Sequence, residues 1–444
     1  MSSGFGVDEL PMPSECKVTQ AFVLHRHGAR YPTISASVVS FGKNLSETLA
    51  QGHAEFKDKL SFLHDWSYGL GLEVLVPFGR QQLYESGVSH YYSYGALYNT
   101  STKIVARTTT QDRMVESAEN FLAGFFGQRW NQNATLETII ESGTGVFNNS
   151  LAGYDNCPNS NRKDLNYGRE ASEQWQEVYL QDAVKRLQSM SLPSYAWTIS
   201  KAFAAQSMCP YETVALGYSS FCSLFTREEW DGFEYAIDLK FSGSTMFPSP
   251  TGRAVGIGWV QELLARLNHQ LITKPTAQDN ITLDSNTRSF PLDQSLYFDF
   301  THDSMITAII TALGFKQFAP ILPAEGPPDP KRSLIISKIV PFAARLVIEI
   351  VKAPRPIKST RSKALDPFED GKETQYIHFL LNSRTLPLGE SFSECGNRDD
   401  GWCELQIFLD IQAKSLERAN YEYSCFGDYA GGKYGDVVDG VPVG

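Results

Sequence analysis

Short apolar runs along the chain predict its β-strands. The first is KVTQAFVL at residues 17–24, a mostly apolar run that suits a strand buried on both faces. Similar runs occupy residues 102–107, 296–301, 342–352 and 376–381. Apolar positions spaced three and four apart instead predict helices at residues 112–126, 171–190, 226–241, 252–271 and 303–313. Two of these helices carry terminal signals, because Thr226 and Glu229 have the spacing of a capping box and Gly314 stands where a left-handed residue ends many helices.

The order of these elements predicts the fold class. Predicted strands lie near both ends of the chain, whereas residues 130–290 are mainly helical and loop. This order is typical of an α/β domain that carries a helical insertion. We place a large α/β domain, with a central mixed sheet flanked by helices, at residues 1–130 and 290–444. A smaller, mainly helical domain is expected at residues 131–289, and the proline-rich stretch 320–330 is expected to be a surface loop.

Composition and charge exclude several classes of partner. The chain has 444 residues, 42% of them apolar, and a formal net charge of −11. This composition is that of a globular protein with a large core. The acidic balance argues against nucleic acid and anionic membranes as partners, since both need a surplus of Lys and Arg. No apolar stretch reaches the length of a membrane span. A small anionic substrate remains compatible with the negative net charge, because the charge inside a pocket can differ in sign from that of the whole surface.

Sequons and cysteines indicate a secreted protein. Acceptor sites for N-glycosylation begin at Asn44, Asn99, Asn133, Asn148 and Asn280. The seven cysteines show no CxxC spacing, which disfavours a zinc ribbon or a redox motif and favours disulfides with one thiol left over. The first residues lack the pattern of a signal peptide, so we interpret the chain as a mature secreted form. The alternative is a cytosolic protein with seven buried thiols.

The segment LHRHGARYPT, residues 24–33, follows the first predicted strand and carries the chemistry of a phosphate site. Ligands of α/β folds lie at the carboxyl ends of strands. Arg26 and Arg30 supply two guanidinium forks that can grip phosphate oxygens, and Gly28 would let backbone amides approach the anion. His27 between them is a candidate nucleophile, because nearby cations keep an imidazole neutral. Each residue alone has an ordinary structural explanation, but the joint pattern does not arise readily by chance.

A second segment, THDS at residues 301–304, complements the first. It lies where the predicted strand 296–301 ends and the helix 303–313 begins. Asp303 is placed as the N-cap of that helix, and His302 is expected to project from the same strand end. An anion there would gain from the unpaired amides of the helix start. Arg113 opens the helix after another predicted strand and is a candidate third arginine.

With these residues in view, the chain resembles the histidine acid phosphatases, most closely their fungal and yeast phytase-like branch. RHGARYPT matches the branch's active-site signature, and THDSM its second motif. The segments CPYETVALGYSSFCSLFTREEW, GIGWVQELLARLNH and YSCFGD extend the resemblance over most of the chain. It implies a phosphoglycerate-mutase-like fold with a large α/β domain and a smaller helical one. It also assigns the third phosphate-binding arginine to Arg113 in DRMVESAENF, with Arg107 as the less favoured alternative.

The resemblance also implies a disulfide pattern. Cys209 would pair with Cys222, Cys395 with Cys403, and Cys157 with Cys425. The cysteine that would pair with Cys16 is missing from the segment IEIVKAPRP. We therefore predict that Cys16 is a free thiol.

The mechanism implied by the resemblance has two steps and needs no metal or other cofactor. His27 forms a phosphohistidine, Arg26, Arg30, Arg113 and His302 neutralise the transferred group, Asp303 protonates the leaving oxygen, and water then releases phosphate. The sequence contains no HExxH, no P-loop and no carboxylate cluster with metal spacing.

The implied substrate is myo-inositol hexakisphosphate (phytate). Members of the branch tend to hold its other phosphates with lysines around the pocket, but after Thr33 this sequence offers only Lys43 nearby. Other basic candidates are Lys240, Arg129 and Lys163. This departure keeps a broad-specificity secreted acid phosphatase as the alternative. More remote are a phosphoglycerate-mutase-like phosphotransferase, which usually takes its acid from a different segment, and a non-catalytic phosphate-binding relative. The sequence leaves the oligomeric state open.

Overall fold

A computed structural model describes residues 5–143 and 145–443, and within these ranges eight strands form one mixed sheet. The strand order is β3-β2-β4-β1-β5-β6-β7, and β8 pairs with β6. Strands β3, β2, β4 and β1 are parallel to their neighbours in this order. Strand β5 pairs antiparallel with β1, β6 pairs antiparallel with β5, and both β7 and β8 pair antiparallel with β6. The strands are β1 (Lys17–Arg26), β2 (Ile104–Thr109), β3 (Ala134–Ile139), β4 (Leu296–Thr301), β5 (Arg345–Ala353), β6 (Thr374–Leu381), β7 (Arg384–Thr385) and β8 (Cys403–Glu404).

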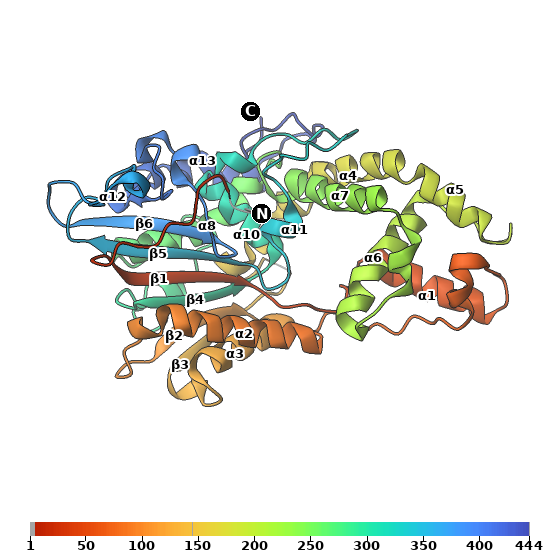
Figure 1. The fold of residues 1–444 in the computed structure, drawn as a ribbon, viewed down its shortest axis with the longest axis horizontal. Helices are drawn as coiled ribbons and strands as arrows, with labels where there is room; N and C mark the ends of the chain where they lie inside the picture. Colours follow the sequence, from red (N-terminus) through yellow and green to blue (C-terminus); the bar gives the residue numbers. More distant parts are fainter. Residues whose placement is uncertain (1–4, 144, 444) are drawn as a thin grey trace.

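Helices cover both faces of this sheet (Figure 1). The α-helices are α1 (Ser37–Ala50), α2 (Pro77–Tyr94), α3 (Asp112–Phe126), α4 (Tyr167–Tyr179), α5 (Gln181–Ser189), α6 (Ile199–Leu216), α7 (Arg227–Thr245), α8 (Gly252–Leu267), α9 (Ile281–Asp284), α10 (Asp303–Leu313), α11 (Ile336–Ile339), α12 (Leu405–Gln412), α13 (Ser415–Ala419) and α14 (Tyr421–Phe426). The mixed α/β class with a central sheet flanked by helices is therefore confirmed.

Strand β1 shows why its sequence is apolar at nearly every position. Ala21 and Val23 pack in the core under α2 and α3, whereas Phe22 and Leu24 pack in the core under α8 and α10. Alternate side chains of a strand point to opposite faces, so a strand covered on both sides needs a continuous apolar run. The expected termini also occur: Thr226 and Glu229 form a capping box at α7, and Gly314 ends α10 with φ of 91°.

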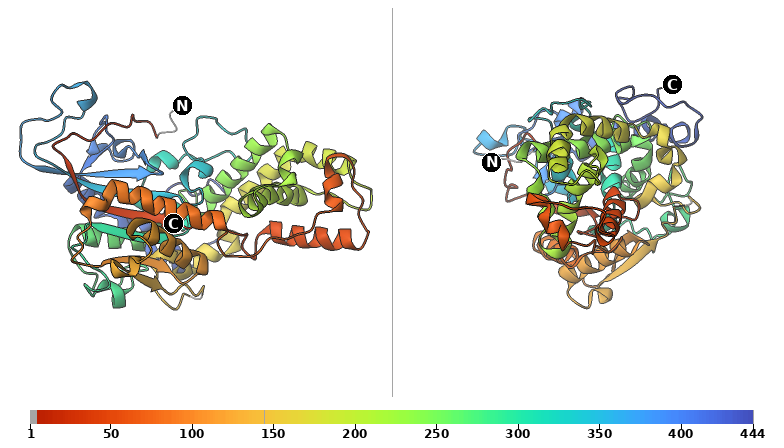
Figure 2. Two further views of the ribbon diagram at one scale, coloured as in Figure 1. Left: turned by 60° about the horizontal axis from the view of Figure 1, so that its bottom comes forward. Right: turned by 90° about the vertical axis from the view of Figure 1, so that its right-hand side faces the viewer.

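A second hydrophobic core lies in a helical lobe beside the sheet. Helix α1 and the 3₁₀ helix Asp58–His64 pack there with α5 and α6. Figure 1 shows α1, α4, α5, α6 and α7 on one side of the molecule, and the left view of Figure 2 shows the same separation from the sheet.

The structure divides the chain differently from the expected ranges 1–130, 131–289 and 290–444. Strand β3 and helix α8 fall in the predicted insertion, yet β3 pairs with β2 and α8 packs on α10. Helix α1, expected in the α/β domain, instead packs in the helical lobe. The lobe therefore combines an early segment with the central part of the chain, and apolar side chains of both pack in its core.

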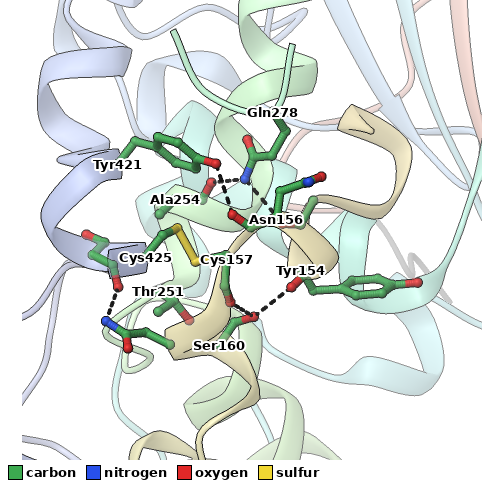
Figure 3. The surroundings of a disulfide bond; sticks show 12 residues. Tyr154, Asn156, Cys157, Ser160, Thr251, Ala254, Gln278, Tyr421 and Cys425 are labelled. Atoms are coloured by element: carbon green, nitrogen blue, oxygen red, sulfur yellow. Dashed lines mark hydrogen bonds between the residues drawn. A yellow bond between two sulfur atoms is a disulfide. The ribbon is translucent and has the colours of Figure 1, made fainter. Parts of the chain in front are cut away.

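Three disulfides link cysteines of the described residues, in the pairs that the resemblance implies: Cys157–Cys425, Cys209–Cys222 and Cys395–Cys403. Figure 3 shows the first, which ties the segment after β3 to α14. Beside it Tyr421 donates a hydrogen bond to the carbonyl of Asn156 at 3.0 Å. Cys16 is free and buried, and burial raises the pKa of its thiol. Among the described helices, none is long and apolar enough to cross a membrane.

Candidate active site

The carboxyl ends of the parallel strands bring the predicted site residues together. Arg26 ends β1 opposite Thr301 of β4, so the residues that follow both strands emerge side by side. The rings of His27 and His302 lie 5.7 Å apart between centroids. Arg113 enters through α3, which begins three residues after β2 ends. The ends of neighbouring parallel strands thus build one site from segments far apart in the sequence.

His27 is buried and held as a neutral imidazole with one nitrogen available for chemistry. The residue is only 1% exposed. Burial, and then the charges of Arg26 and Arg30, hold its pKa well below the usual range. Nδ1 lies 2.9 Å from the carbonyl oxygen of Gly28. A carbonyl only accepts hydrogen bonds, so Nδ1 carries the proton and the Nε2 lone pair is available as a nucleophile.

Gly28 allows its loop to pack closely against two helices. A Cβ at this position would lie 2.2 Å from the carbonyl oxygen of Gly79 in α2. The amide of Gly28 donates to Ser117 Oγ at 3.2 Å. The loop therefore lies directly on α2 and α3, and this close approach requires glycine.

Asp303 pairs with Arg26 across the two strand ends. Its Oδ2 lies 2.5 Å from Arg26 Nη2. Burial opposes ionisation of Asp303, but the charges of Arg26, Arg30 and His302 together lower its pKa. Asp303 is the first residue of α10, and His302 is the N-cap, without a side-chain capping bond. The predicted N-cap is thus shifted by one residue, although Asp303 Oδ1 still accepts from the amide of Ser304 at 2.8 Å.

The three predicted arginines lie close enough together for their charges to act on one another. Burial, and then the charges of Arg30 and Arg113, lower the pKa of Arg26, while Asp303 opposes them. Burial and the neighbouring charge of Arg30 lower the pKa of Arg113. Guanidinium groups that repel one another at the same strand ends favour an anion between them, which a phosphate could supply.

Arg107 has a different environment from Arg113. It donates to Asp299 at 2.8 Å and to Glu262 at 2.6 Å, and its side chain is buried. Arg266 completes this cluster, 3.2 Å from Asp299. Arg107 is thus paired with carboxylates inside the fold, whereas Arg113 lies near Arg30.

Glu141 is a site residue that the sequence reasoning missed. It follows β3, and its Oε2 lies 3.2 Å from His302 Nε2. Tyr154 donates to its Oε1 at 2.6 Å. Burial opposes ionisation, but the hydrogen bond and charge of His302 outweigh it and lower the pKa of Glu141 to about 2. The only signal in the sequence was its place after a strand, and β3 itself was not predicted.

The additional basic candidates lie exposed at separate places. Lys43 is on α1, Arg129 follows α3, Lys163 precedes α4 and Lys240 is on α7. No group of three or more His, Cys, Asp or Glu side chains in the described parts of the chain could hold a metal ion.

Comparisons with known proteins agree with this geometry. The family pattern of the histidine phosphatase superfamily (branch 2) matches residues 17–382. Phytase A of Arthroderma benhamiae is 32% identical over 423 residues, covering 93% of this chain and 87% of that protein. Phytase A of Aspergillus oryzae is 31% identical over 413 residues, covering 90% and 83%.

Solved structures share the fold. The crystal structure of the phytase from D. castellii has a TM-score of 0.75 at 23% identity, covering 97% of this chain and 86% of that one. A Bifidobacterium longum multiple inositol polyphosphate phosphatase, solved with inositol hexasulfate, has a TM-score of 0.53 at 13% identity, covering 85% and 88%. Given the match over residues 17–382 and the close relatives across most of its length, the chain belongs to branch 2 of the histidine phosphatase superfamily.

Proposed function

We propose that this protein is an acid phosphomonoesterase that hydrolyses phytate through a phosphohistidine intermediate. The observation that carries the proposal is the neutral His27, with its Nε2 lone pair available, beside the gathered charges of Arg26, Arg30 and Arg113. A phosphate group provides the negative charge and the hydrogen-bond acceptors that such a cluster of guanidinium groups favours.

In the first step His27 Nε2 attacks phosphorus, and the bond between phosphorus and the ester oxygen breaks. Arg26, Arg30 and Arg113 stabilise the charge on the transferring oxygens, which is the main catalytic contribution in phosphoryl transfer. His302 adds a fourth polar contact, oriented by Glu141. Water then attacks the phosphohistidine, releasing inorganic phosphate and restoring His27.

Asp303 supplies the proton to the leaving oxygen. In the ligand-free site Arg26 holds the carboxylate ionised. A phosphate bound to Arg26 removes this cationic partner and places an anion nearby. Both changes raise the pKa of Asp303, so substrate binding itself favours the protonated acid that the reaction needs.

The relatives support the choice of substrate. Proteins named Phytase A share 31–32% identity with this chain over nine-tenths of its length. A protein with the same fold was solved with the phytate mimic inositol hexasulfate. The inference for this chain rests on that similarity together with its arginine-rich site.

The disulfides and the N-glycosylation sequons of the chain fit a location outside the cell. Three disulfides persist in oxidising compartments. Asn44 and Asn99 are exposed, as glycan acceptors must be, whereas Asn133, Asn148 and Asn280 are half-buried. We propose a secreted enzyme, and mass spectrometry of the secreted protein would identify which of the five asparagines carry glycans.

The substrate assignment is tested by comparing turnover of phytate and p-nitrophenyl phosphate at about pH 5 with EDTA present. A higher kcat/KM for phytate supports the proposal. A preference for p-nitrophenyl phosphate would instead indicate a broad-specificity acid phosphatase. Transfer of the phosphoryl group to an acceptor without release would indicate a mutase-like enzyme, and no turnover of either compound would indicate a binding protein.

A further inference from the structure

Glu73 places a carboxylate at the rim of the site, in contact with one of its arginines. Its Oε2 lies 2.7 Å from Arg113 Nη1, and its Oε1 accepts from the amide of Ile34 at 2.8 Å. The Glu73 side chain is 40% exposed, while that of Arg113 is only 11% exposed. The carboxylate therefore lies at the rim and contacts a guanidinium that is itself largely buried.

The backbone fixes this carboxylate beside the phosphate loop. The amide of Glu73 donates to the carbonyl of Pro32 at 3.1 Å, and the amide of Tyr31 donates to the carbonyl of Val74 at 3.1 Å. These bonds join the segment around Glu73 to the end of RHGARYPT. Glu73 is thus held in place by its neighbours and does not need the ion pair with Arg113 to stay there.

The charge of Glu73 acts directly on Arg113. Burial and Arg30 lower the pKa of Arg113, whereas the charge of Glu73 opposes them. Glu73 therefore supplies part of the negative charge that a phosphate supplies when one is bound. A bound phosphate and Glu73 compete for ionic contacts with the same guanidinium group. The two anions also repel each other.

We propose that Glu73 is a positioning residue that competes with phosphate for Arg113. It weakens the binding of inorganic phosphate, the product, and so favours its release. The inference rests on the proposed function, because it takes the arginine cluster as the phosphate site.

The test measures the inhibition constant Ki of inorganic phosphate against p-nitrophenyl phosphate. Glu73→Gln removes the charge and lets the amide oxygen keep the bond to Ile34. We expect Ki to fall by about 3- to 10-fold, a moderate effect because the pair is partly exposed and screened, with kcat changed less than Ki. Glu119→Gln, an exposed glutamate on the same helix as Arg113, is the matched control and should leave Ki unchanged.

A double-mutant cycle separates competition from other roles. In the Arg113→Ala background, Glu73→Gln should tighten phosphate binding much less than in the wild type, because only the direct repulsion between the two anions is left to remove. An unchanged or raised Ki in the single variant would overturn the proposal, and a raised Ki would mean that Glu73 only positions Arg113. Should Glu73→Gln not fold, Glu73→Ala provides the same comparison. If the wild-type protein hydrolyses neither p-nitrophenyl phosphate nor phytate, the proposed function fails rather than the role of Glu73.

Discussion

Arg26 Nη2 and Asp303 Oδ2 lie 2.5 Å apart, although 277 positions of sequence numbering separate the two residues. The pair forms because β1 and β4 are parallel neighbours whose last residues are in register. One partner is proposed to hold phosphate and the other to protonate the leaving group. Their contact in the ligand-free site therefore couples phosphate binding to the protonation of the acid.

Asp303→Asn should slow alkyl phosphates far more than p-nitrophenyl phosphate. An alkoxide needs a proton to leave, and losing a general acid costs about 10²- to 10⁴-fold. p-Nitrophenolate leaves with little protonation. Freeing Arg26 affects both substrates alike, so the ratio of the two losses isolates the acid role. Steady-state kinetics with the two substrates measures this ratio, and equal losses would argue against Asp303 as the acid.

Glu141→Gln should weaken phosphate binding through His302. The substitution removes the charge that accompanies His302 while keeping an oxygen within hydrogen-bond reach. Charged hydrogen bonds contribute enough that we expect kcat/KM to fall by about 10- to 100-fold. Tyr154→Phe is the control, because it removes one hydrogen bond to Glu141 but leaves the carboxylate and its contact with His302. A larger loss in Tyr154→Phe than in Glu141→Gln would contradict this role.

The protonation of Asp284 should make a contribution to the free energy of unfolding that falls as the pH rises. Asp284 is buried, and its Oδ2 has no hydrogen-bond partner among the described residues. Burial, followed by the charge of Glu262, raises its pKa despite the opposing charges of Arg107 and Arg266. The folded state thus holds a proton that the unfolded state releases above about pH 3.9. The stability that depends on this proton is complete below that pH and declines as the pH rises, by up to about 1.4 kcal/mol per pH unit.

Asp284→Asn should remove this decline. Urea unfolding at pH 4, 5.5 and 7 would show a flatter pH dependence for the variant, with its largest relative gain at pH 7. Asp293→Asn is the control, since the Asp293 side chain is 97% exposed. Parallel pH profiles for wild type and Asp284→Asn would contradict the assignment.

The elements that sequence analysis found best are those with a strong apolar pattern. The helices at residues 112–126 and 303–313 and the strand at 296–301 match α3, α10 and β4 in their bounds. Both signature segments directly follow or precede such elements, so the sequence alone places five of the site residues at strand ends. Arg113 needed the family resemblance, because Arg107 has the same residue type near the same strand.

Other elements lack that pattern for physical reasons. The buried positions of α2 include Gly79, Ser86, Gly87 and His90, which give no apolar periodicity. Strand β3, ATLETI, lies at the edge of the sheet, where exposed polar residues are tolerated. Because β3 was not predicted, Glu141 was not recognised as a site residue and the expected domain boundary was placed before β3. Glu73 belongs to a loop, and only the fold brings it to Arg113.

The nucleophile assignment is the central claim, and trapping the phosphoenzyme tests it most directly. Wild-type protein mixed briefly with labelled phytate and quenched should carry phosphate bound to nitrogen, labile in acid and stable in alkali. Phosphopeptide mapping should place it on His27. His27→Ala should show no turnover and no trapped phosphate. An equally labelled, acid-labile phosphoprotein in His27→Ala would contradict the claim.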